Sequence, residues 1–335
     1  MPIGQSPTSF DVEIAAGTAC ALLVALAAAA HKPTGELPHD LAAALAAVGD
    51  GEGEVWLNLF GVPLDAGPPY SAERLLDALS AMDAVELRRQ LLGRYAWSWC
   101  TLAGIDDLES ASAGDRAAAG RLLAHSRYYG GHATASLGVL LTLDPAETQR
   151  RLVRAVECGS SSLLDLTASS ELEAAELAAA ETIAARSPLT SIEHLAAGYR
   201  YVPEPEAERV VLIPHLEPDV PLVLAQHRAS RLIVYRARRD RSSEERLLAL
   251  GRALADPKRV EILALVGRGV GRASDLVERT GLSRSTVHHH LAQLREAGLV
   301  ALEGNARAYT YIPHRSAAGG TAELVAEVIG TEEDA

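Results

Sequence analysis

A helical stretch near residue 290 gathers short polar and basic side chains on one of its sides. When the stretch is projected at about 100° per residue, Val287, Leu291 and Leu294 fall together and must pack on other helices. The opposite side and its edges hold Arg284, Ser285, Thr286, His288, His289 and Gln293. Hydroxyl groups donate or accept, and His can donate to guanine or to phosphate. The chemistry expected here is hydrogen bonding to the base edges and phosphates of double-stranded DNA.

Two elements must hold this face against a duplex. A short helix over 273–280 ends at Gly281, and Ser283 then caps a helix that runs to about Ala297. Two helices joined by such a tight turn can place the second in the major groove while the first braces it. The sequence therefore predicts a helix-turn-helix.

An alternating stretch after Gly298, LVALEGNARAYTYIP, predicts a β-hairpin. Its strands are expected over 299–303 and 307–312, on either side of a Gly-Asn turn. In this hairpin Arg307 is placed to enter the minor groove or to contact the backbone, with Tyr309 supporting it. We therefore expect a wing beside the helix-turn-helix.

Helices are also predicted before this pair. An Asp-Pro pair at 256–257 supplies an N-cap and a first helical residue. The buried positions expected in that helix are Val260, Leu263 and Val266. The whole module is predicted to occupy residues 241–318, with a short helix and an acidic tail over 319–335.

Four pieces of the module form a constellation: LADPKRVEIL, TGLSRSTVHHHL, LREAGLV and EGNARAYTY. Together they resemble the winged helix-turn-helix of the ArsR/SmtB family over residues 244–313. Related winged families such as MarR share this architecture. The resemblance implies a homodimer that reads an inverted-repeat operator through the helix Ser283–Ala297 and the wing Leu299–Ile312. It also implies a repressor that an inducer releases.

Metal sensing is not expected. Metal-sensing relatives carry Cys in the helix before the turn, where this sequence reads RASDLVERTG, and the C-terminal helix lacks the His/Asp pair of the zinc sensors. The triplet 288–290 cannot converge on one ion, because consecutive helical positions point in different directions. Cys20, Cys100 and Cys158 lack the spacing of a disulfide framework or a zinc site. We predict no metal, no cofactor and a cytoplasmic location.

The charge of the chain is divided unevenly. The formal net charge is −13, yet residues 241–315 hold 12 basic against 8 acidic side chains, a net of +4. The rest of the chain therefore carries −17. An acidic body with one basic segment is typical of a DNA-reading module attached to a domain that does not bind DNA.

The long N-terminal part, residues 1–240, is expected to be a separate helical domain. Apolar residues make up 48 % of the chain and aromatic residues only 4 %, so Ala, Leu and Val must build the core, a mixture that favours helices. The apolar run 14–30 lacks a preceding basic residue and is short for a bilayer span, which predicts a buried helix. Three β-branched runs over 201–236 predict a short antiparallel meander. The expected fold class is mainly α with small β elements (α+β).

One stretch of the N-terminal part is a candidate for ligand binding. Trp97, Trp99, Tyr128 and Tyr129 concentrate aromatic side chains in an aromatic-poor chain, and they could line a pocket or fill gaps in the core. Signatures of nucleotide-binding proteins and hydrolases are absent from the sequence, so no catalytic residue is predicted. Residues 1–240 could sense a non-metal ligand, act as a scaffold for dimerisation or protein contact, or be an enzyme fused to the DNA-binding module. The leading hypothesis is a sensor.

Overall fold

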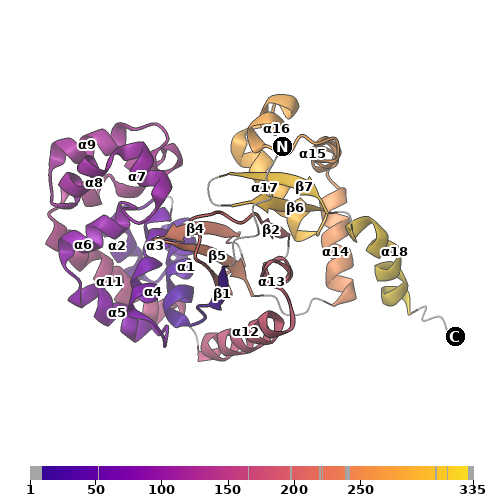
Figure 1. Ribbon diagram of the computed structural model, residues 1–335, viewed down its shortest axis with the longest axis horizontal. Helices are drawn as coiled ribbons and strands as arrows, with labels where there is room; N and C mark the ends of the chain where they lie inside the picture. The colour runs from indigo at the N-terminus through magenta and orange to yellow at the C-terminus, as the bar shows by residue number, and fades with distance from the viewer. Residues whose placement is uncertain are drawn as a thin grey trace. The chain divides into compact units, whose positions relative to one another are not determined.

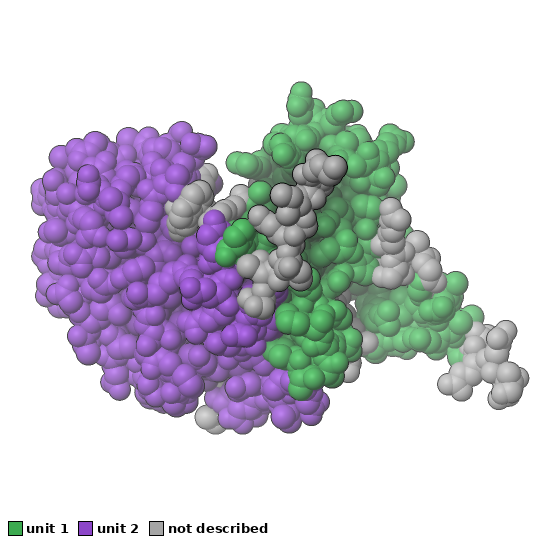
Figure 2. All heavy atoms as spheres, in the orientation of Figure 1, with its two compact units in different colours: residues 1–8, 182–205, 238–335 green, residues 9–181, 206–237 purple. Residues whose placement is uncertain are grey.

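The chain forms two compact units, each assembled from more than one stretch of sequence (Figures 1 and 2). The computed structural model describes residues 10–51, 53–164, 166–196, 198–218, 220, 222–237, 242–305, 308–314 and 316–330. It does not describe the side chains at 34, 97–99, 130, 166, 285, 316–319 and 321. Unit 1 comprises residues 1–8, 182–205 and 238–335, and unit 2 comprises residues 9–181 and 206–237. The boundary expected near residue 240 stays a prediction.

Unit 2 is built around a helix that is buried on all sides. This helix, α1 (Thr18–Ala30), has ten buried residues among its 13. A helix that is apolar all round belongs in the interior of a protein, as the sequence predicted for the run 14–30. The longer helix α11 (Pro145–Leu163) packs against it. Among the described residues no helix is both long and apolar enough to cross a membrane.

Further helices complete the helical part of unit 2, and the last of them, a helix of 20 residues, ends in residues of unit 1. In chain order they are α2 (His39–Val48), α3 (Glu54–Asn58), α4 (Gly61–Ala66), α5 (Ala72–Ala81), α6 (Ala84–Leu91), α7 (Trp97–Ala103), α8 (Ile105–Ser112), α9 (Arg116–Ala124), α10 (Ala133–Leu137) and α12 (Leu166–Ala185). Single 3-10 turns lie at Thr34–Glu36, Tyr128–Gly131 and Leu140–Thr142.

The sheet of unit 2 has the strand order β1-β3-β5-β4. The strands β1 (Asp11–Ile14), β3 (Arg209–His215) and β5 (Ser230–Arg236) run parallel, and β4 (Val223–His227) pairs antiparallel with β5. The antiparallel meander predicted over 201–236 is therefore wrong, because among the described residues of this range only β4 and β5 pair antiparallel. Parallel strands that are buried on both faces read as continuous apolar runs. The runs VVLI in β3 and LIVY in β5 are of this kind, and all of their residues are buried.

Unit 1 contains the predicted helix-turn-helix and wing. Its C-terminal elements are α14 (Ser243–Leu254), α15 (Pro257–Gly267), α16 (Ala273–Thr280), α17 (Arg284–Glu296), β6 (Val300–Gly304), β7 (Tyr309–Pro313) and α18 (Ser316–Ile329). The segment before β3 adds α13 (Pro188–Leu195) and β2 (Tyr199–Tyr201). Strand β2 joins the wing in a sheet of order β2-β6-β7, which the sequence did not predict.

The core of unit 1 differs from the prediction in α15. Asp256 caps this helix as expected, accepting from the backbone N–H of Lys258 at 2.7 Å. Val266 is buried, but Val260 is 41 % exposed and Leu263 is only half-buried. Ile262 faces the core in place of Val260, since Ile262 and Val266 lie four residues apart on one face.

Candidate nucleic-acid interface

The turn between α16 and α17 is fixed by backbone conformation and capping. Gly281 ends α16 with φ +66°, a left-handed conformation that few side chains tolerate. Ser283 then caps α17, its hydroxyl accepting from the backbone N–H of Thr286 at 3.2 Å. Val287, Leu291 and Leu294 are fully buried, which confirms the packed side of the helix. The opposite side of α17 is thereby directed away from the core of unit 1.

That opposite side carries the predicted base-reading residues. His289 and Arg284 are exposed, and Thr286 and Gln293 are half-buried. The hydroxyl of Thr286 lies 2.7 Å from that of Ser283, at the start of the helix. The side chain of Ser285 lies outside the described part of the structure. Contact of these residues with DNA stays a prediction.

The two histidines beside His289 are less accessible. Burial and the nearby Arg284 lower the pKa of the half-buried His288. Burial also lowers the pKa of His290, whose Nδ1 atom has no hydrogen-bond partner within the described structure. Both rings therefore favour the neutral form at neutral pH. Across the described residues there is no group of three or more His, Cys, Asp or Glu side chains that could hold a metal ion.

The wing is a hairpin with a closed turn. Val300 pairs with Pro313 at one end, and Gly304 pairs with Tyr309 at the other. Asn305 closes the turn, because its backbone N–H donates to the carbonyl of Ala308 at 3.0 Å. Tyr309 is exposed and its ring meets that of Tyr311 edge-on. Arg307, predicted to contact DNA, lies outside the described residues.

The aromatic candidates in unit 2 are placed differently. Tyr128 and Tyr129 are fully buried, and their hydroxyls donate to the backbone carbonyls of Leu92 and Leu91. Burial raises the pKa of both hydroxyls, which keeps them protonated. The side chains of Trp97 and Trp99 lie outside the described part of the structure. A ligand pocket at these four residues stays a prediction.

Unit 2 also contains a small polar pocket, two of whose lining residues directly precede Trp97 in the sequence. It measures about 10 Å³, room for one water-sized group. Its lining comprises Asn58, Gln90, Gly93, Tyr95, Ala96, Gln226 and His227. Gln90 is almost fully buried and its Oε1 has no hydrogen-bond partner in the described structure. A buried amide without a partner costs free energy, so the pocket favours a group that hydrogen-bonds to it.

The tip of the hairpin β4–β5 is bound to Asp65, next to this pocket, through His227 and Arg228. His227 Nε2 lies 2.9 Å from Asp65 Oδ1, and burial lowers the pKa of this imidazole. Arg228 has φ +54°, pairs with Asp65 at 3.1 Å and stacks 4.2 Å from the ring centre of Tyr95. A Cβ at Gly61 would lie 2.5 Å from the His227 ring. Only glycine therefore allows His227 and Gln90 to approach here.

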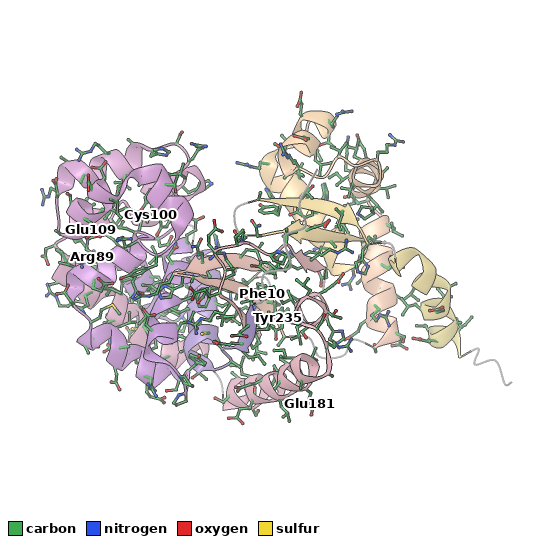
Figure 3. The ribbon with its side chains drawn as sticks, viewed as in Figure 1. Phe10, Arg89, Cys100, Glu109, Glu181 and Tyr235 are labelled. Carbon is green, nitrogen blue, oxygen red and sulfur yellow. The ribbon has the colours of Figure 1, made fainter. Side chains whose placement is uncertain are left out.

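The loop that supplies Tyr95 is tied down by ion pairs. Glu109 binds Arg89 Nε at 2.7 Å and Arg94 Nε at 2.9 Å, and Arg89 and Glu109 are labelled beside Cys100 in Figure 3. The Cys100 thiol donates to the carbonyl of Arg94, and burial raises its pKa. A protonated thiol is a poor nucleophile. These ion pairs hold Arg94 beside Cys100, but burial outweighs the effect of this guanidinium, so the thiol stays protonated.

Known proteins match the chain in its C-terminal part. The model of the bacterial regulatory protein arsR family matches residues 256–301. The HTH-type transcriptional regulator CmtR of Mycobacterium tuberculosis, and that of Mycobacterium bovis, is 39 % identical over 92 residues, which are 27 % of this chain and 78 % of the relative. The HTH-type transcriptional regulator YgaV of Escherichia coli is 37 % identical over 71 residues, 21 % of this chain and 72 % of the relative. No solved structure matches the chain.

Proposed function

Because the chain belongs to the ArsR family of bacterial regulatory proteins, we propose that it is a cytoplasmic repressor that reads an inverted-repeat operator as a homodimer. Its helix-turn-helix makes it a DNA-binding transcriptional regulator. The observation that carries the proposal is α17, which buries its apolar side and leaves Arg284 and His289 exposed. Unit 2, in this proposal, senses a small non-metal ligand and catalyses no reaction.

The reading face is tested on the protein's own upstream DNA. A triple variant with Ala in place of Ser285, Thr286 and His289 lacks the hydrogen-bonding groups but keeps the buried side of α17 intact. Each good base contact contributes about 1–3 kcal/mol of discrimination, so sequence preference should fall by at least tenfold. Lys258→Ala serves as the control, because this exposed basic residue lies on α15. Unchanged sequence preference in the triple variant would contradict the proposal.

Exposed apolar side chains on two contacting helices of unit 1 support a homodimer. Leu248 and Leu254 on α14, and Val325 and Ile329 on α18, are exposed. The two helices pack together, and the hydroxyl of Ser243 donates to the Glu327 carboxylate. Exposed apolar patches mark interaction surfaces, and two copies of one patch satisfy two-fold symmetry. Light scattering should give a dimer for the wild type and a monomer for Leu248→Glu/Ile329→Glu; a wild-type monomer that binds one half-site would contradict it.

Ligand sensing is supported by the polar pocket of unit 2. The pocket has room for one water-sized group, and the buried Gln90 Oε1 can accept a hydrogen bond from a donor of that size, such as a hydroxyl that a ligand inserts. A thermal-shift screen with small hydroxylated and amide metabolites should find a stabilising compound. Gly61→Ala should abolish that shift, since the new methyl group would occupy the approach of His227 and Gln90. A screen without any stabilising compound would favour a scaffold role for unit 2.

A further inference from the structure

Strand β2 lies on the outer edge of the wing, although the sheet strands of unit 2 separate it from α14 in sequence. It runs parallel to β6, with Tyr199 opposite Leu302 and Tyr201 opposite Gly304. The backbone N–H of Leu302 donates to the carbonyl of Gly198 at 2.7 Å. An uncovered edge strand would present such groups unpaired. Strand β2 therefore closes the edge of the hairpin that is predicted to contact DNA.

The carbonyl of Gly304, where the wing turns, is held by two donors from this segment. The hydroxyl of Tyr199 and the backbone N–H of Val202 each donate to it at 2.9 Å. Tyr199 is 1 % exposed, and burial raises the pKa of its hydroxyl, so the group remains a donor. Gly304 has φ +145°, and a Cβ there would lie 2.2 Å from the carbonyl of Ala308. The two donors thus fix the point at which β6 enters the turn.

The same segment also reaches the recognition helix. Gly198 has φ +81°, and a Cβ at this position would lie 2.8 Å from Cγ of Arg295 on α17. The side-chain amide of Asn305, in the wing turn, lies 3.4 Å from the carbonyl of Val202. Residues 198–202 therefore contact both the end of α17 and the turn of the wing. They are placed to set the angle between these two elements.

We propose that Tyr199 and Val202 are positioning residues for DNA binding, which hold the wing turn in the orientation that reaches the DNA backbone beside the major groove. The inference rests on the proposed function, because it takes the wing to be a DNA contact. It adds a segment outside residues 256–301, the part matched by the family model, to the DNA-binding machinery. Neither residue needs to touch DNA itself.

Removing the two donors one at a time tests the proposal in the full chain. Tyr199→Phe deletes only the hydroxyl, whereas Val202→Pro deletes the N–H and also fixes φ at a residue whose side chain is 41 % exposed. Each variant should bind the upstream DNA about threefold to tenfold more weakly, the equivalent of one hydrogen bond. Hydroxyl-radical footprinting should show lost protection of the backbone at the flanks that the wing covers, whereas dimethyl sulfate should still show protection of guanine N7 in the major groove that α17 contacts. The plot of log affinity against log salt should become flatter.

A matched variant separates positioning from general stability. Thr148→Val in unit 2 also deletes a fully buried hydroxyl that donates to a backbone carbonyl, that of Leu140 at 3.2 Å. It should lower the unfolding temperature and leave DNA affinity and footprint unchanged. Wild-type affinity and footprint in both Tyr199→Phe and Val202→Pro would overturn the proposal, as would an equal loss of affinity in Thr148→Val. A wild-type chain that binds no DNA would instead contradict the proposed function.

Discussion

The two units place their polar side chains in opposite ways. Unit 1 exposes Arg284 and His289 on α17, where water solvates them until a partner binds. Unit 2 buries polar groups, among them Arg88 and His215, several of whose nitrogen atoms have no hydrogen-bond partner among the described residues. Burying such groups costs free energy. We therefore expect the behaviour of unit 1 to depend on salt through DNA binding, and the stability of unit 2 to depend on pH.

The Trp residues provide an intrinsic fluorescence probe for this comparison. All three Trp residues, at positions 56, 97 and 99, belong to unit 2. Trp fluorescence therefore follows the unfolding of unit 2, while DNA binding reports on unit 1. Each prediction below uses this difference.

The largest effect is expected from the cores. Leu291→Ala empties a fully buried position in unit 1, and Leu212→Ala does the same in unit 2. Each should destabilise its own unit by about 2–5 kcal/mol, because a cavity remains. In urea titrations followed by Trp fluorescence, Leu212→Ala should shift the transition and Leu291→Ala should not. Only Leu291→Ala should abolish DNA binding; equal shifts in the two variants would mean that the units unfold together.

The next effect is the pH dependence of unit 2. Burial and Arg236 lower the pKa of His215 from 6.5 to about 4. A His with a lowered folded pKa stabilises the fold above its unfolded pKa, and that contribution is lost as pH falls from 6.5 towards 4. The loss amounts to about 3 kcal/mol at its limit and to about 2 kcal/mol by pH 5. Urea unfolding followed by Trp fluorescence at pH 7 and pH 5 should show it.

His215→Leu is the control for this effect. It should reduce the difference between pH 7 and pH 5 but not remove it, because burial also lowers the pKa of His227 in the same unit. An unchanged pH dependence in this variant would assign the effect to other groups.

A smaller effect is expected from two equivalent helix caps. Asp144 caps α11 in unit 2 and Asp256 caps α15 in unit 1, each followed by Pro. Replacing either with Ala should cost about 1 kcal/mol, the usual value of an N-cap. Trp fluorescence should detect the destabilisation by Asp144→Ala alone. Differential scanning calorimetry, which follows the unfolding of both units, should detect the destabilisation by either variant. A silent Asp256→Ala would mean that tertiary packing holds the start of α15.

The smallest effect is expected from exposed ion pairs. Lys258–Glu261 on α15 and Arg150–Glu147 on α11 are close pairs in which the basic side chains are well exposed to water. Pairs of this kind contribute about 0–1 kcal/mol. Lys258→Gln and Arg150→Gln should leave both unfolding midpoints nearly unchanged. A shift as large as that of the cap variants would reveal a wider charge network.

The helix-turn-helix was predictable because its signals are local. Gly281 ends α16, Ser283 begins α17, and the apolar side of α17 follows from helical spacing alone. The residues that form the wing hairpin are likewise adjacent in sequence. Such signals require no knowledge of the rest of the chain. The prediction that Val260 is buried was wrong because it assigned the wrong face of α15 to the core.

The sheet of unit 2 and strand β2 could not be predicted in the same way. Strand β1, at the start of unit 2 in the sequence, pairs with β3 in its last segment. Strand β2 pairs with β6, and the strands β3 to β5 of unit 2 lie between them in the sequence. Period and propensity identify a strand but not its distant partner. β2 has only three residues, too few for an alternating pattern. The residues that line the pocket beside Gln90 come from helices, a loop and a hairpin tip, so no sequence motif indicates the pocket.

The central claim, that unit 1 reads DNA through α17 and the wing, is tested most directly by footprinting the full chain on its upstream region over a range of salt concentrations. The account predicts two protected half-sites separated by about one helical turn or a multiple of it. It also predicts an affinity that falls linearly on a log–log plot as salt rises, because bound basic side chains release counterions from the phosphates. A flat salt dependence with no protected half-site would contradict it.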